Sequence, residues 1–191
     1  MSPRQLLGRE YYQTSFGQTF LVLTPVAVHT SAVVTKRLIA SHRTPRNFTS
    51  SFALTGYAAL IFFAPIHFLL HRVYPAEPSP PTLAFGPAEL DFEFVKYGLH
   101  TWPLRSWFLY GGLTACVLWH AAAGMQIEWN TWMRGMLGPF PATARQRGAA
   151  VGALVLCVLS GLAVLAREPL MALASSVTRF EGAFAQSFVY A

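Results

Sequence analysis

Four long apolar segments dominate this sequence and decide what it can fold into. They cover roughly residues 16–39, 51–73, 104–129 and 149–166. A helix needs about 20 mainly apolar residues to cross the hydrocarbon core of a membrane, and each segment is close to that length. In lipid the backbone amides must be paired within the segment itself, which a helix achieves. The sequence therefore predicts an all-α, polytopic membrane helical bundle with four spans and, as described below, a short interfacial helix.

The composition agrees with a membrane protein. The chain of 191 residues is 53% hydrophobic and only 12% charged, whereas soluble domains average about 25% charged residues. The formal net charge is +6, but the Lys and Arg residues lie between the apolar segments rather than in one patch. We interpret them as topology signals and headgroup contacts, so we expect membrane lipids as partners and no nucleic acid.

The pattern along the chain indicates one bundle with short ends. We expect a short N-terminal segment over residues 1–15, the transmembrane bundle over 16–168 and a C-terminal tail over 169–191. The second and third spans are joined by a Pro-rich linker, PAEPSPPTLAFGP, and by an interfacial helix at about 88–100. The most basic loops follow the first and third spans and fall on the same side of the membrane, which supports the count of four.

Three of the apolar segments each carry a histidine: His29, His67 and His120. An ionisable residue within a membrane is a functional-site hypothesis by default, because leaving it unpaired in hydrocarbon is costly. Carboxylate partners are few, since no Asp or Glu occurs from Tyr11 to Ala76. The partners left are the other histidines, hydroxyl groups, backbone carbonyls or a bound cofactor.

Haem b is the cofactor that this pattern favours. Its iron needs axial ligands on opposite faces of the macrocycle, so two helices must supply them. The first and third spans run in the same direction with their histidines near mid-depth, so we predict His29 and His120 as the ligands of the haem iron. His67 is a third candidate. The alternative is that each histidine hydrogen-bonds across helices with no cofactor bound.

Basic residues near the ends of the spans form a second group of candidates. They could bind lipid headgroups or haem propionates, or simply anchor the spans at the interface. These residues are Lys36, Arg37, His71, Arg72 and Arg105.

Catalytic motifs do not occur in the sequence. There is no Ser-His-Asp arrangement, no H-E-x-x-H, no Gly-rich phosphate loop and no pair of carboxylates within a span. We therefore predict no catalytic residues and no enzyme, unless a bound haem is redox-active.

Four blocks of sequence carry a family resemblance. They are REYYQTSFGQTFLVLTPVAVHTSAVVTKRL, LTGYAALIFFAPIHFLLHRVYP, ELDFEFVKYGLHTWPLRSWFLYGGL and WHAAAG. The resemblance covers roughly residues 9 to 132, and the part from Glu89 to Gly124 is the most specific. These blocks resemble the fungal Mcp-type transmembrane domain family, which is distantly similar to the cytochrome b anchor subunits of succinate dehydrogenase and fumarate reductase.

The resemblance implies a function that the residues alone do not. Family members are polytopic proteins of the mitochondrial outer membrane that act in lipid homeostasis and compensate for loss of the ER–mitochondria encounter structure. At least one is an adaptor that recruits a bridge-like lipid-transfer protein through a Pro-x-Pro motif in its N-terminal tail. For this chain the resemblance implies an adaptor or membrane-contact factor of mitochondria. A bis-histidine haem-b cytochrome and a cofactor-free lipid-handling protein are the alternatives.

The chain also departs from the family pattern. Members carry an N-terminal tail and one further His-bearing span before the REYYQT-like block, and we expect both to be missing here. In a bundle with four histidines the family would pair the first helix with the third and the second with the fourth. His29 and His120 would then form a complete pair, His67 would lack its partner, and the recruiting tail would be absent.

Overall fold

The computed structural model describes residues 11, 14–40, 50–86 and 89–191, and every regular element in these ranges is a helix. Four helices are long and apolar enough to cross a membrane: Gly17–Ile39, Ser51–Ala76, Pro103–Leu137 and Ala144–Arg167. The prediction of an all-α polytopic bundle is confirmed, and the chain is an integral membrane protein by these helices. The structure divides into two compact units, residues 1–48 with 85–91 and residues 49–84 with 92–191.

The first unit contains one long helix, made of η1 (Gly17–Leu23) and α2 (Thr24–Ala40). The second unit contains the remaining helices. Its first crossing helix is built from five consecutive pieces: α3 (Ser51–Tyr57), η2 (Ala58–Phe63), α4 (Ala64–Phe68), η3 (Leu69–Val73) and η4 (Tyr74–Ala76). It is followed by α5 (Phe92–Thr101), α6 (Pro103–Glu128), η5 (Trp129–Met133), α7 (Arg134–Leu137), α8 (Ala144–Arg167) and α9 (Ala174–Ala185).

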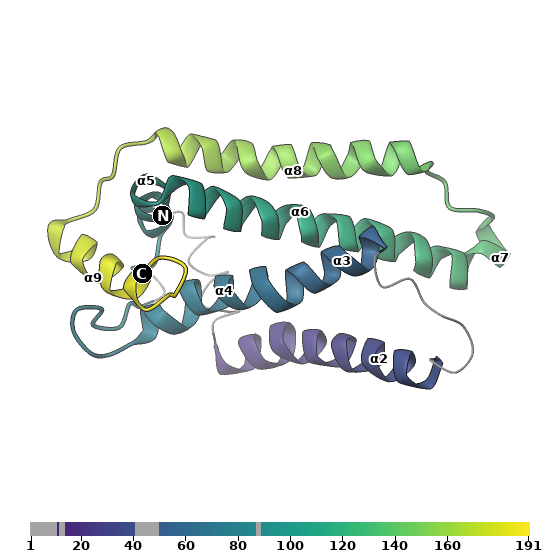
Figure 1. Cartoon of the computed structure of the whole chain (residues 1–191), viewed down its shortest axis with the longest axis horizontal. Helices are drawn as coiled ribbons and strands as arrows, with labels where there is room; N and C mark the ends of the chain where they lie inside the picture. Colours follow the sequence, from purple (N-terminus) through teal and green to yellow (C-terminus); the bar gives the residue numbers. More distant parts are fainter. Residues whose placement is uncertain (1–10, 12–13, 41–49, 87–88) are drawn as a thin grey trace. The chain divides into compact units, whose positions relative to one another are not determined.

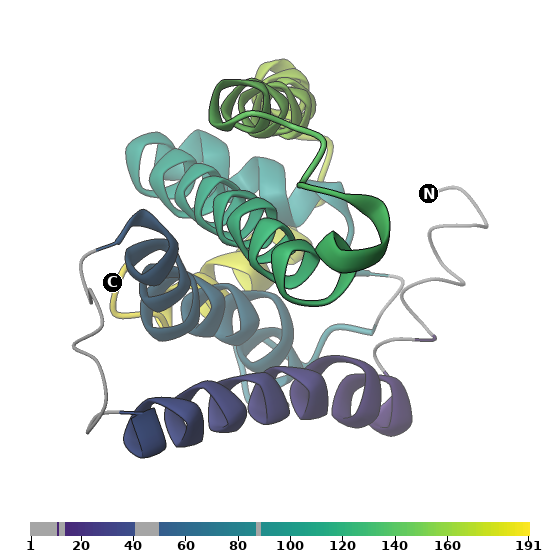
Figure 2. The same ribbon diagram turned by 90° about the vertical axis from the view of Figure 1, so that its right-hand side faces the viewer.

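Helix α6 is the centre of the second unit. It packs against α3 and η2 on one side and against α8 on another, and the ribbon views show it between α8 and the helix formed by α3 and α4 (Figures 1 and 2). Leu109 and Ser106 of α6 are buried. Residues on α6 can therefore contact both neighbouring helices.

Widened π-helical turns occur just before three prolines. The segments η1, η2 and η3 end two residues before Pro25, Pro65 and Pro75 respectively. Proline has no N–H to donate, and its ring crowds the carbonyl four residues earlier. A wider turn relieves this crowding. At the end of η2, for example, the Ala64 N–H bonds to the Ala59 carbonyl, one residue further back than in an α-helix.

The helix ends differ from the sequence prediction at two places. The third crossing helix continues to Leu137 instead of stopping near 129, and α8 begins at Ala144 instead of near 149. A capping box explains the early start of α8. Thr143 Oγ1 accepts from the Gln146 N–H at 3.3 Å, and Gln146 Oε1 accepts from the Thr143 N–H at 2.8 Å.

One end of the second unit is closed by a compact group that we call the cap. The cap consists of residues 77–84, α5, α9 and residues 186–191, and α5 and α9 lie at the same end of α6 (Figure 1). Its core is aromatic: Phe94 and Phe184 are fully buried and stack with ring centroids 4.7 Å apart. Trp102 stacks on Phe184 at 5.3 Å. Residues 174–191 of the C-terminal tail thus contribute to a folded core.

Candidate functional site

His120 is fixed between α6 and α3. Its Nδ1 lies 2.9 Å from the Phe52 carbonyl oxygen, and its ring stacks on the Phe52 ring at 4.3 Å. A carbonyl only accepts, so His120 Nδ1 is the donor of this bond. Gly56 provides the room, since a Cβ added there would lie 2.6 Å from His120 Cε1.

A second polar group, which we call the His–Tyr cluster, consists of His67, His71 and Tyr110. The two histidine rings lie 4.5 Å apart, and His71 Nε2 is 3.0 Å from the Tyr110 hydroxyl. The His71 ring also meets Phe94 of the cap edge-on at 5.5 Å. His71, predicted to contact headgroups, therefore bonds within the protein and links the first crossing helix of this unit to α6.

The two groups lie at different levels along α6. Tyr110 and His120 are ten residues apart in one helix, which corresponds to about 15 Å. His67, beside Tyr110, and His120, beside Phe52, therefore do not meet at one iron. His29 lies on α2 in the first unit, so its pairing with His120 stays a prediction.

His120 has one feature in common with histidines that bind haem iron. Histidines that bind iron usually donate their other N–H to a carbonyl or carboxylate, which fixes the ring, and the Phe52 carbonyl plays that part here. Within the described ranges, no group of three or more His, Cys, Asp or Glu residues could hold a metal ion. A haem would thus depend on His120 together with a histidine of another helix.

The predicted basic contacts divide into two groups. Arg105 Nη1 donates to the Val189 carbonyl at 2.8 Å and so ties the start of α6 to the C-terminal residues. Lys36 and Arg37 lie near the end of α2, and Arg72 lies in η3. A role for these residues in headgroup or propionate binding stays a prediction.

Lys96, which the sequence reasoning did not single out, is the most buried charge of the cap. It is 4% exposed, forms an ion pair with Glu93, donates to the Pro169 carbonyl at 3.0 Å and lies 3.7 Å from Glu168. The hydrogen bond that Lys96 donates to the Glu93 carboxylate raises the pKa of Lys96. The spacing of Glu93 and Lys96, three apart on one helix, was the signal available in the sequence.

Arg179 of α9 holds the linker between η4 and α5. Its guanidinium donates to three successive carbonyls, those of Thr82 at 2.9 Å and of Leu83 and Ala84 at 3.2 Å each. Leu83 and Ala84 have positive φ angles of 56° and 35°, which residues other than glycine rarely adopt. We call this arrangement the carbonyl clamp, because the arginine stabilises a backbone that would otherwise relax.

Ser106 connects α6 to the end of the chain. It is fully buried, donates to the Gly98 carbonyl at 2.7 Å and lies 3.1 Å from the Tyr190 hydroxyl. Burial raises the pKa of Tyr190. Ser106 thus fastens the cap to α6, and Lys96 fastens it to the residues that follow α8. The carbonyl clamp joins two parts of the cap to each other.

The fold and these contacts define an integral membrane helical bundle that carries an ordered cap. In comparisons with known proteins, no family model, no curated protein and no solved structure matches this chain.

Proposed function

We propose that this chain is a membrane-anchored scaffold of mitochondria that acts in lipid homeostasis, as an adaptor or membrane-contact factor. The observation that carries the proposal is the cap. A folded surface fastened to crossing helices presents a partner with a fixed shape, which a flexible tail would not do. The buried polar groups of the cap bond mainly to one another and to backbone carbonyls, an arrangement suited to rigidity.

One helix of the cap, α5, lies within the stretch that carries the family resemblance. The stretch from Glu89 to Gly124 forms α5 and most of α6, and it supplies Phe94, Lys96 and Ser106. The mitochondrial outer membrane and the bridge-like lipid-transfer protein enter the proposal from the resemblance alone.

The test is rescue of mitochondrial phospholipid composition in cells lacking the chain. The Arg179→Gln variant loses the carbonyl clamp, whereas Arg167→Gln changes an exposed arginine and serves as the matched control. We expect the wild-type chain and the control to restore the phospholipid profile and to co-precipitate the lipid-transfer protein, and Arg179→Gln to do neither at equal membrane abundance.

Two results would contradict the proposal. The first is an unchanged phospholipid profile in cells lacking the chain. The second is an Arg179→Gln variant that rescues as well as the control does, which would separate the cap from the function.

A haem-b cytochrome is the second candidate, and the bond between His120 and the Phe52 carbonyl favours it. Membranes from cells supplied with haem precursor should then show a Soret band that shifts on dithionite reduction. His120→Ala and His29→Ala should abolish this band, whereas the exposed His100 of α5 provides the control. Absence of the band from wild-type membranes would eliminate this candidate and leave the cofactor-free scaffold.

A further inference from the structure

The last part of the third crossing helix is longer than a membrane requires. The helix from Pro103 to Leu137 has 35 residues, or about 52 Å at 1.5 Å per residue, whereas the hydrocarbon core is about 30 Å thick. We call residues 125–137, which comprise the end of α6 with η5 and α7, the α6 overhang. A helix of this length cannot lie wholly within the core, even at a tilt of about 40°.

Neighbouring helices of the second unit leave much of the overhang uncovered. Phe52, near the start of α3, packs at the level of His120 and Gly124, and α8 starts only at Ala144. In the ribbon view α7 lies beyond the start of α8 (Figure 1). A Cβ added to Gly135 would meet nothing within 4 Å among the described residues.

Large apolar side chains are exposed on this overhang. Trp132 is 72% exposed and Met136 is 77% exposed. They are four residues apart and so share one face of the helix. Met125 and Ile127, at the start of the overhang, are exposed as well, so large apolar side chains are exposed along much of its length.

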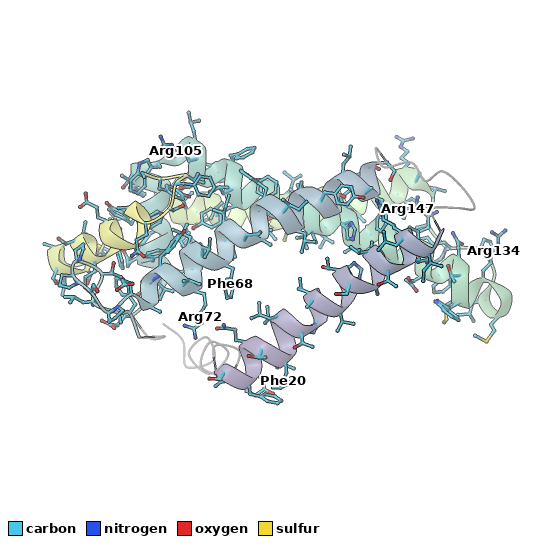
Figure 3. All side chains as sticks on the ribbon, turned by 60° about the horizontal axis from the view of Figure 1, so that its bottom comes forward. Phe20, Phe68, Arg72, Arg105, Arg134 and Arg147 are labelled. Carbon is cyan, nitrogen blue, oxygen red and sulfur yellow. The ribbon has the colours of Figure 1, made fainter. Side chains whose placement is uncertain are left out.

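The end of the second unit that carries the α6 overhang is also basic. Arg134 and Arg145 are exposed, and Arg147 lies at this end, whereas Arg105 lies at the other (Figure 3). Arg147 is engaged with the Ala142 carbonyl and the Phe140 ring. Glu128 is the sole acid between residues 125 and 147, and it accepts from Trp132 Nε1 at 3.0 Å.

We propose that the α6 overhang is a binding site for anionic phospholipids, with Trp132 and Met136 inserted at the headgroup–acyl boundary and Arg134 and Arg145 held near the phosphates. Tryptophan is favoured at this depth because its ring is amphipathic. A guanidinium matches phosphate geometry, and a basic residue near an anionic surface contributes about 1 kcal/mol.

Helix tilt makes the insertion geometrically feasible. Membrane helices tilt by up to about 40°, which would reduce the depth spanned by a helix of about 52 Å to about 40 Å. This equals the thickness of a bilayer with its headgroups. The apolar face of the overhang then lies within the interface instead of in water.

The test uses the full chain reconstituted in vesicles. Cys116 and Cys157 are replaced by Ala, and a single cysteine at Met136, Met136→Cys, carries an environment-sensitive fluorophore. Matched labels at Leu156→Cys, on the exposed face of α8, and at Ser175→Cys, in the cap, provide the lipid and water references. The vesicles contain phosphatidylcholine alone or mixed with phosphatidylglycerol.

We expect the label at residue 136 to emit between the two references and to be quenched by lipids brominated near the headgroup, more strongly by brominated phosphatidylglycerol than by brominated phosphatidylcholine. The Arg134→Gln/Arg145→Gln variant should lose that excess quenching and keep the emission wavelength. Equal quenching by the two lipids in the wild-type chain would overturn the anionic preference.

If the label at residue 136 shows the emission wavelength and iodide quenching of the label at residue 175, the water reference, the proposed insertion is wrong. Oxidative cross-linking between two copies through residue 136 would likewise overturn it, because the apolar face would then be a protein contact. None of these outcomes depends on the mitochondrial function proposed above.

Discussion

Replacement of Lys96 by Met should destabilise the cap measurably. Methionine keeps most of the volume of the buried stem but removes the bond to the Pro169 carbonyl and the ion pair with Glu93. A hydrogen bond from a charged group contributes about 1.5–3 kcal/mol. The pair with Glu168, whose side chain is half exposed, adds close to nothing.

The Glu93 carboxylate, which loses its partner in Lys96→Met, determines the rest of the loss in unfolding free energy. Loss of one partner of a fully buried pair costs about 3–5 kcal/mol, but the Glu93 side chain is 20% exposed and still accepts from the Met171 N–H at 2.7 Å. We therefore expect Lys96→Met to lower the free energy of unfolding by about 2–3 kcal/mol in total.

Two measurements check this value. Equilibrium unfolding in mild detergent, followed by tryptophan fluorescence, gives the free energy, because Trp102 lies in the aromatic core of the cap. Trypsin cleavage after Arg167, next to the contacts of Lys96, reports local opening and should accelerate in the variant. Arg145→Met, at the opposite end and exposed, should change stability by no more than about 0.5 kcal/mol.

A second substitution separates the charge effect from packing. Glu93→Gln in the Lys96→Met background removes the unpaired carboxylate while its amide oxygen can still accept from Met171. Stability should partly recover. Equal unfolding midpoints for Lys96→Met and Arg145→Met would refute the reasoning, as would a double variant less stable than Lys96→Met alone.

Three further results are expected. Gly182→Ala should destabilise the chain by about 1–2 kcal/mol in the same unfolding assay, since its Cβ would lie 2.6 Å from Pro81. Gly161→Ala is the control and should be neutral or stabilising, because its Cβ would meet nothing within 4 Å among the described residues. Equal effects of the two substitutions would contradict the packing of α9. A double-mutant cycle with Ser106→Ala and Tyr190→Phe should give a coupling energy of about 0.5–1.5 kcal/mol, and strict additivity would mean that the two hydroxyls do not interact. The pKa of Lys96 is raised in the folded state. The contribution of Lys96 to stability is therefore complete below its unfolded pKa of about 10.4 and is lost as the pH rises through the folded value. The difference in unfolding free energy between wild type and Lys96→Met should stay constant from neutral pH to about pH 9 and shrink above about pH 10.5.

Hydropathy predicted the crossing helices because each must bury a continuous apolar surface in lipid. The helices extend beyond the predicted spans where polar residues and helical backbone coincide. Glu128 and Arg134 end the apolar run, yet the backbone stays helical to Leu137. The early start of α8 depends on a capping box at Thr143, which hydropathy does not register.

The cap lay beyond the reach of sequence reasoning, because its contacts join residues far apart in the chain. Arg179 bonds to carbonyls at residues 82–84, and Ser106 lies against Tyr190. Neither partner can be read from local spacing. The histidines show the same limit: their presence in the spans was visible, but the Phe52 carbonyl and the Tyr110 hydroxyl that meet His120 and His71 were not.

The dimensions of α8 have a consequence for the kind of bilayer that suits this protein. The stretch between Arg147 and Arg167 is about 28 Å long, close to the thickness of the thinner cellular membranes and several ångströms short of a sterol-rich one. The third crossing helix can span a thicker membrane by tilting less, whereas the apolar stretch of α8 is too short to do so. Hydrophobic mismatch at α8 would then cost a fraction of a kcal/mol per ångström, so the length of α8 favours a thinner bilayer.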